Sequence, residues 1–228
     1  MSNKLPLGVI FDFNGVIVDD YPIQKQAWNE ISLAIRNKNA TDDEMVRKIR
    51  GVPPKNTIEW MGGYRLKSEI VIRLAKKKET ITKELYLSST LFRLNSGFSF
   101  FLDELKLQSI PRIIATSSSF DSMKFSFNKL GFARWFDVDN IVYNDGSYRG
   151  KPASDAYLLA AQKIQLPPPA CVVFEDAVSG ITAAFAAGVR YIVAVGTEER
   201  TKILCQLPGV VKSIRDFTEV TVQNMLLA

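Results

Sequence analysis

The sequence contains no histidine and only two cysteines, Cys171 and Cys205, among its 228 residues. Without histidine, neither a Ser-His-Asp nor a Cys-His catalytic arrangement can be built. Two cysteines also do not make an ordinary zinc site, so we expect any bound metal to be a hard, oxygen-liganded cation such as Mg²⁺. Scarce cysteine favours a reducing compartment, and we expect a cytoplasmic protein.

Long apolar runs are also missing from the chain. No window approaches the roughly 18 apolar residues of a transmembrane helix, and the N-terminal stretch does not resemble a signal peptide. The composition, 46% apolar and 23% charged, is typical of a globular protein. The net charge of +5 comes from scattered basic residues, and the densest run, Lys76-Lys77-Lys78, is expected on a solvated helix face. We therefore expect small anionic ligands rather than nucleic acid or a membrane.

A short apolar stretch, Val9-Ile10-Phe11, runs directly into Asp12, and Asn14-Gly15 follows. This pattern predicts a buried parallel strand that brings Asp12 to the carboxyl edge of a sheet, where ligands bind in open α/β folds. Later strands are predicted to alternate with helices, which indicates βαβ units and a parallel sheet. The predicted strands cover 112–115, 140–143, 171–174 and 191–195, and the predicted helices cover 98–107, 120–130, 155–164 and 180–187.

Between these parts lies a stretch of about 70 residues with helical spacing of apolar residues and no convincing strand. Asp19 or Asp20 is expected to cap its first helix, and Thr41 with Glu44 forms the pattern of a capping box. We therefore predict an α/β fold, with a Rossmann-like doubly wound parallel sheet core and an inserted all-helical cap. The predicted boundaries are 1–17 and 94–228 for the core and 18–93 for the cap.

Polar side chains follow the predicted strands or lie in one loop, at Asp12, Thr116, Lys151 and Glu175-Asp176. They should converge, because parallel strands end at one edge of the sheet. A carboxylate can attack phosphorus, and crowded carboxylates need a cation such as Mg²⁺. Thr116 with the amides that follow suits phosphate oxygens, and Lys151 adds a neutralising charge. The set predicts phosphoryl transfer.

Four segments resemble motifs I to IV of the haloacid dehalogenase superfamily. The resemblance spans nearly the whole chain and is greatest to the branch of β-phosphoglucomutases and phosphatases that carry an α-helical cap. The order and spacing of the four segments carry it, since each motif alone would be weak. The segments are Asp12-Phe13-Asn14-Gly15-Val16, Ala115-Thr116-Ser117-Ser118, Gly150-Lys151-Pro152-Ala153-Ser154-Asp155 and Phe174-Glu175-Asp176-Ala177-Val178-Ser179-Gly180-Ile181.

The resemblance implies a role for each matching residue. Asp12 would be the nucleophile and a Mg²⁺ ligand, and residue 14 would give its backbone carbonyl to the metal. Asp176 would be the outer metal carboxylate, with Glu175 beside it as a further ligand. The transferring phosphoryl group would be held by the remaining members of the motifs, namely Gly15, Thr116, Ser117 and Lys151.

Asn14 departs from the family, whose phosphatases and mutases carry an aspartate there as general acid and base. An asparagine amide donates hydrogen bonds but transfers no proton, and losing such a group costs on the order of 10²–10⁴ in rate. Gln24 stands where β-phosphoglucomutases have a histidine. Pro53-Pro54, with Lys55 beside it, stands where they have an arginine for the second phosphate.

We therefore expect a monomeric, Mg²⁺-dependent phosphatase that acts on a small phosphorylated metabolite through an aspartyl-phosphate, attenuated by Asn14. One alternative is a catalytically impaired homologue that binds a phosphometabolite as a sensor. A β-phosphoglucomutase-like phosphosugar mutase is another, although the changes in the cap count against it. Asn14 itself has further interpretations, an engineered substitution or deamidation to aspartate at Asn14-Gly15.

Overall fold

The computed structural model describes residues 7–225. Within this range, five parallel strands form one sheet in the order β2-β1-β3-β4-β5. Phe11 at the end of β1 pairs with Ile114 of β2 on one side and with Phe174 of β3 on the other. The strands are β1 (Gly8–Phe11), β2 (Arg112–Ile114), β3 (Cys171–Glu175), β4 (Tyr191–Val195) and β5 (Val210–Ile214).

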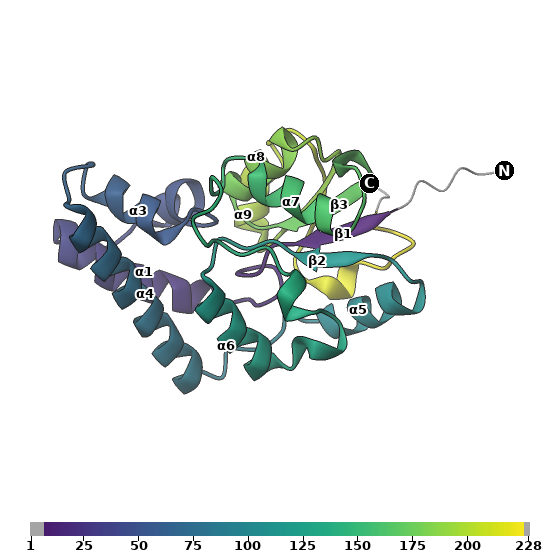
Figure 1. The fold of residues 1–228 in the computed structure, drawn as a ribbon, viewed down its shortest axis with the longest axis horizontal. Helices are drawn as coiled ribbons and strands as arrows, with labels where there is room; N and C mark the ends of the chain where they lie inside the picture. The colour runs from purple at the N-terminus through teal and green to yellow at the C-terminus, as the bar shows by residue number, and fades with distance from the viewer. Residues whose placement is uncertain (1–6, 226–228) are drawn as a thin grey trace.

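Helices cover both faces of the sheet, as Figure 1 shows. Side chains alternate along β1, so that Phe11 packs into a cluster with Phe98 and Phe101, while Ile10 packs on the other face with Tyr157 and other residues. This arrangement confirms the predicted doubly wound α/β fold. The helices of this part are α5 (Phe98–Leu107), α6 (Phe120–Leu130), α7 (Asp155–Lys163), α8 (Val178–Ala186) and α9 (Glu198–Leu204), with 3₁₀ turns at Phe132–Arg134, Val138–Asn140, Pro168–Ala170 and Phe217–Glu219.

A second group of helices lies to the left of the sheet in Figure 1. It has an apolar cluster of its own, which includes Trp28, Ile31 and Ile58. The predicted capping box is present, since Thr41 Oγ1 accepts from the Glu44 amide and the Glu44 side chain accepts from the Thr41 amide. The elements are α1 (Tyr21–Arg36), α2 (Asp42–Glu44), the π-helical turn η1 (Met45–Ile49), α3 (Pro54–Met61) and α4 (Ser68–Ser88).

One sequence-based prediction of secondary structure was wrong, and two elements were not predicted. The strand predicted over 140–143 is only a single bridge between Ala115 and Val142, because Asn140 still belongs to a 3₁₀ turn. Helix α9 and strand β5, which follow the predicted strand over 191–195, were missed. Strand β5 was missed because it lies at the sheet edge, where Val211 is exposed and the pattern is only half apolar.

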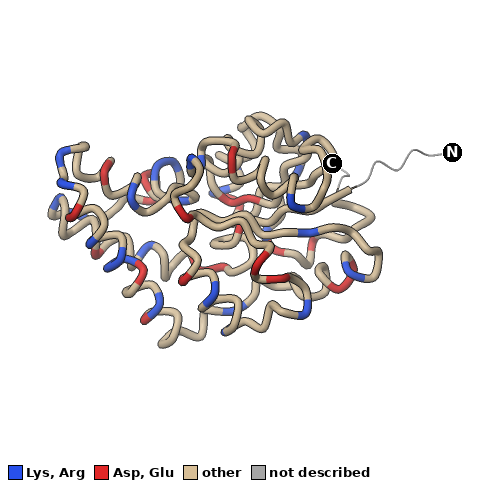
Figure 2. Tube along the Cα trace, in the orientation of Figure 1, with Lys and Arg blue, Asp and Glu red and all other residues tan. Residues whose placement is uncertain are grey.

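Lys and Arg lie among Asp and Glu over both parts of the molecule in Figure 2, as the scattered basic residues of the sequence predict. Among residues 7–225, no helix has both the length and the apolar character needed to cross a membrane.

Candidate active site

Three carboxylates meet at the carboxyl edge of the sheet. Asp12 follows β1 directly, Glu175 is the last residue of β3, and Asp176 follows it. The register places Asp12 beside β3, where its amide donates to Phe174 O at 3.0 Å. All three side chains are buried, and one oxygen from each lies within 4.8 Å of the others. We call Asp12, Glu175 and Asp176 the acidic cluster.

Lys151 neutralises part of this cluster. Its Nζ lies 2.6 Å from Asp12 Oδ1 and 2.7 Å from Glu175 Oε1, and it donates to Ala115 O at 3.1 Å. Burial alone would lower the pKa of Lys151, but the charges of Asp12 and Glu175 outweigh burial and raise it. The lysine therefore remains a cation at neutral pH, as binding a phosphoryl group requires.

Glu175 holds Lys151 in place. Its Oε1 accepts from Lys151 and from the Tyr157 hydroxyl, and its Oε2 accepts from the amides of Asp176 and Ala177. These four hydrogen bonds use the usual accepting capacity of a carboxylate. A Cβ on Gly180 would lie 1.6 Å from Glu175 Oε1, so only glycine fits beside it.

The pKa of Asp12 is shifted by its surroundings in the cluster. Burial raises the pKa of Asp12 to about 7, with Glu175 adding to the shift and Lys151 opposing it. A divalent cation beside the cluster would lower this pKa again. Hard oxygen donors, buried together and with an excess of negative charge, are the donors that Mg²⁺ takes, so the residues present fit such a metal.

Arg50 reaches the cluster from the helical group. It follows η1, its side chain is buried, and its guanidinium pairs with Asp176 Oδ2. Gly15 lies beneath this pair at φ +86°, and a Cβ there would overlap both Arg50 and Asp176. The chain at Arg50 is fixed to the sheet part, because the Ser179 hydroxyl donates to Arg50 O at 2.7 Å.

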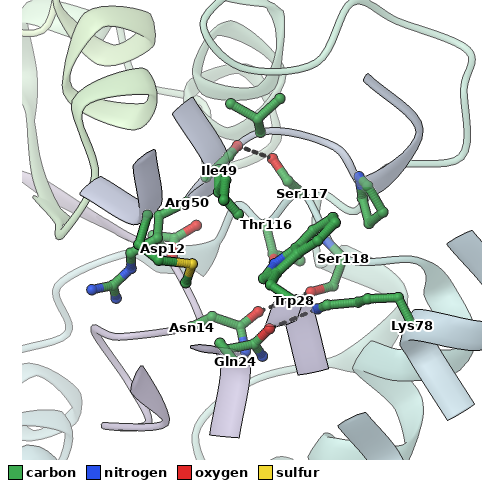
Figure 3. Close-up of a pocket in the computed structure, with 14 residues that line it drawn as sticks. Asp12, Asn14, Gln24, Trp28, Ile49, Arg50, Lys78, Thr116, Ser117 and Ser118 are labelled. Atoms are coloured by element: carbon green, nitrogen blue, oxygen red, sulfur yellow. Dashed lines mark hydrogen bonds between the residues drawn. The ribbon is translucent and has the colours of Figure 1, made fainter. Parts of the chain in front are cut away.

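A cavity of about 70 Å³ opens beside Asp12 (Figure 3). Thr116, which the sequence predicted after a strand, lines it and is buried. Ser117 also lines it, but its hydroxyl donates to Gly51 O at 2.6 Å and so helps to hold the helical group over the site. Further lining residues come from the helical group and include Gln24, Trp28, Met45, Ile49, Arg50 and Lys78.

Asn14 also borders the cavity but is tied to other protein groups. Its Nδ2 donates to Asp20 Oδ2 at 2.7 Å and to the Tyr86 hydroxyl at 2.9 Å, while its Oδ1 accepts from Ser118 Oγ at 3.0 Å. Gln24 donates to the same Asp20 oxygen and to the same hydroxyl, at 2.7 and 2.8 Å. We call Asn14, Asp20, Gln24, Lys78 and Tyr86 the hinge network.

Two members of the hinge network were misjudged from the sequence. Asp20 was expected to cap the first helix if Asp19 did not, but it makes no capping hydrogen bond among the described residues, and its carboxylate turns to Asn14 instead. Lys78 was expected on a solvated face, yet it is only 9% exposed, donates to Gln24 Oε1 at 2.6 Å and lies over the Trp28 ring. Its position on the same helix face as Val71, Ala75 and Thr82, which are also buried, is the signal that could have found it.

Comparison with known proteins agrees with this geometry. The family model of haloacid dehalogenase-like hydrolases matches residues 7–188. The phosphorylated carbohydrates phosphatase of Thermotoga maritima is 30% identical over 188 residues, which are 82% of this chain and 84% of that protein. A haloacid dehalogenase hydrolase of family IA, variant 3, from Entamoeba histolytica has a solved structure with a TM-score of 0.85 and 32% identity, covering 96% of this chain and 97% of that one.

A longer relative matches only in part. The chloroplastic 5-amino-6-(5-phospho-D-ribitylamino)uracil phosphatase of Arabidopsis thaliana is 28% identical over 179 residues. The match covers 78% of this chain but 47% of that protein, so the chain spans about half of its length. With the fold, the strand-end cluster and these matches together, the chain belongs to the haloacid dehalogenase-like hydrolases.

Proposed function

We propose that this hydrolase is a Mg²⁺-dependent phosphatase that cleaves a small phosphorylated metabolite through an aspartyl-phosphate on Asp12. The observation that carries the proposal is the placement of Lys151, within 2.7 Å of both Asp12 and Glu175 at the floor of a buried acidic cluster. A cation held against the nucleophile suits an incoming phosphoryl group. The named phosphatases among its relatives support the same reaction class.

The metal would be held by the carboxylates of Asp12 and Asp176 and by the backbone carbonyl of Asn14. Glu175, a further predicted ligand, belongs to the cluster, but its four hydrogen bonds favour a role in fixing Lys151. When bound, Mg²⁺ would supply positive charge to the phosphate oxygens and hold the Asp12 carboxylate ionised.

In the proposed reaction, an Asp12 oxygen attacks phosphorus, and the bond from phosphorus to the leaving oxygen breaks. Lys151 and the Thr116 hydroxyl neutralise and orient the phosphoryl group, and Gly15 and Ser117 line its position. The leaving oxygen takes a proton from solvent, because Asn14 has none to transfer. Water then cleaves the aspartyl-phosphate, releasing inorganic phosphate and restoring Asp12.

We propose that the helical group is a cap that selects the substrate. The cap would comprise residues 18–93, and the core residues 1–17 and 94–228. Gln24, Trp28 and Lys78 face the cavity from it and would contact the part of the metabolite beyond the phosphate. Because Asp12 is buried and residues of both parts wall the cavity, we propose that the cap moves to admit the substrate. We propose that the protein acts as a monomer, because the two-part architecture suits a single chain whose cap opens and closes.

The test is a panel of phosphate esters and acyl phosphates assayed with Mg²⁺, comparing the native chain with Asp12→Ala. We expect phosphate release that is highest for good leaving groups, and Mg²⁺-dependent binding of vanadate or BeF₃⁻, both lost in Asp12→Ala. Asp19→Ala, which removes an exposed carboxylate nearby, is the matched control. Turnover that survives in Asp12→Ala would overturn the proposal.

A second candidate function is favoured by one observation, the complete engagement of the Asn14 amide by protein groups. A site built this way could bind a phosphometabolite as a sensor without turning it over. In that case the panel would show tight, Mg²⁺-dependent binding with no phosphate release.

A further inference from the structure

Asp20 is a buried carboxylate in the segment that joins β1 to α1, and its side chain is fully shielded from solvent. Its Oδ2 accepts hydrogen bonds from Asn14, Gln24 and the Tyr86 hydroxyl. Its Oδ1 has no hydrogen-bond partner among residues 7–225. A carboxylate placed this way depends on the donors it has, because an unpaired buried charge is costly.

The partners of Asp20 come from distant parts of the chain. Asn14 lies in the loop after β1, Gln24 on α1 and Tyr86 near the end of α4. Burial and the Asp20 charge raise the pKa of Tyr86 well above its ordinary value, so the phenol keeps its proton and remains a donor. The carboxylate thus ties the active-site loop to two helices of the proposed cap.

Asn14 suits this position because its amide is a donor. Nδ2 carries two hydrogens, and these go to Asp20 and to Tyr86. An aspartate at position 14 would place a second carboxylate oxygen at hydrogen-bond distance from Asp20 Oδ2. When ionised, it repels Asp20 strongly in this buried site. When protonated, it gives its one hydrogen to Asp20 and has none left for Tyr86 or for a leaving group.

We propose that Asn14 and Asp20 are a matched pair, in which Asp20 positions the Asn14 amide and makes asparagine, not aspartate, the residue that position 14 accepts. Asp20 is a positioning residue and acts through Asn14. The catalytic part of the inference rests on the proposed phosphatase function. It implies that Asn14→Asp alone will not yield a competent acid, whereas exchanging both residues will.

The experiment is a double-mutant cycle of Asn14→Asp, Asp20→Asn and the exchanged variant carrying both changes. The exchanged variant keeps one carboxylate and one amide, so the bond between residues 14 and 20 re-forms with donor and acceptor reversed. Gln24 then loses its acceptor at residue 20, and the Tyr86 hydroxyl can donate to residue 14 instead. Melting temperature is measured without metal, and phosphate release from an acyl phosphate is measured with Mg²⁺. Asp19→Asn is the matched control, because it makes the same chemical change at the exposed neighbouring residue.

We expect Asn14→Asp to lower the melting temperature by about 5–10 °C, as loss of a buried bond to a charged group predicts for a chain of this size. The exchanged variant should recover about half or more of that loss, because the bond between residues 14 and 20 is restored although Gln24 has lost its acceptor at residue 20. Its turnover should exceed that of Asn14→Asp by about tenfold or more, because only there is the new acid accommodated.

Equal losses of melting temperature from Asn14→Asp in the native and the Asp20→Asn backgrounds would overturn the pairing. If Asn14→Asp fails to fold while the exchanged variant folds, the pairing is supported. If the two substitutions are coupled in melting temperature but no variant releases phosphate, the phosphatase function is refuted and the pairing is supported. If Asn14→Asp alone raises turnover and the melting temperatures show no coupling, the pairing is refuted and the phosphatase function is supported.

Discussion

The acidic cluster and the hinge network both contribute side chains to one cavity, but they are built in different ways. The cluster consists of residues at strand ends, with Lys151 locked between Asp12 and Glu175 at 2.6 and 2.7 Å. The hinge network joins residues up to 72 positions apart, as Asn14 and Tyr86 are. Under the proposed function, the cluster supplies the groups for phosphoryl transfer, whereas the network holds an amide where the family resemblance implies a proton carrier. The difference suggests that nucleophilic attack and leaving-group protonation are separable in this chain.

The largest loss of activity is expected on substitution of Asp12, the proposed nucleophile of the cluster. Asp12→Asn keeps the shape of the side chain and removes the attacking carboxylate, so kcat should fall by about 10⁴ or more. Phosphate release under single-turnover conditions measures it. The exposed control Asp19→Asn should remain near the native rate. Equal losses in the two variants would mean that Asp12 has no special part in the reaction.

Lys151→Met is expected to damage both activity and stability. It leaves Asp12 and Glu175 as buried carboxylates without their shared cation, which should lower the free energy of unfolding by about 3–5 kcal/mol. Turnover should fall by about 10²-fold or more, because the phosphoryl group loses its neutralising charge. Urea unfolding and phosphate release measure the two effects. Lys163→Met, at an exposed lysine on α7, should change neither by comparison.

In the hinge network, the buried Lys78 should make the free energy of unfolding depend on pH. Burial lowers the pKa of Lys78 from its ordinary value of 10.5 to about 8, although Asp20 and Glu79 favour the charged form. Because the folded-state pKa is the lower one, the unfolded chain binds more protons between these values, and stability rises with pH there.

The native chain should therefore gain about 2–3 kcal/mol relative to Lys78→Met as the pH is raised from 7 to 10. Urea unfolding of both proteins at matched pH values isolates this difference, since the other titrating groups are common to both. A stability difference that stays constant over this range would show that Lys78 is not desolvated in solution.

The smallest effect on binding is expected at Arg50, where the helical group meets the acidic cluster. Its guanidinium pairs with Asp176 and so competes with a cation for that carboxylate. Arg50→Gln should tighten binding of Mg²⁺ or Mn²⁺ by about fivefold or more, equivalent to about 1 kcal/mol of charge repulsion. Titration calorimetry on the metal-free chain measures this directly. Arg47→Gln removes an exposed arginine of η1 and serves as control. An unchanged metal affinity in Arg50→Gln would show that Arg50 does not oppose metal binding.

The cluster could be predicted from the sequence because strand ends are encoded locally. An apolar run followed by a carboxylate identifies the end of β1 or β3, and parallel strands then bring those ends together. Helices α5 and α6 were predicted from strong local periodicity, and the structure confirms them. The family was predicted from four short motifs in order, which are also local, and the family model confirms it.

The hinge network could not be predicted in this way. Asp20 precedes α1 and has the pattern of a helix cap. Only the fold shows that its carboxylate accepts hydrogen bonds from Asn14 and Tyr86 instead. Lys78 sits in a basic run, and the helix face that it shares with Val71 and Ala75 signals its burial but not its bond to Gln24. Side chains that pair across such distances leave no local signal, whereas the departure at Asn14 was visible at once.

The most direct test of the account is to trap the phosphorylated intermediate. The native chain would be incubated with an acyl phosphate and Mg²⁺, quenched in acid and mapped by peptide mass spectrometry. We predict a phosphoryl group on the peptide that contains Asp12, absent in Asp12→Asn and absent when the metal is chelated. Phosphate release with no labelled Asp12, or with the label on another residue, would contradict the central claim.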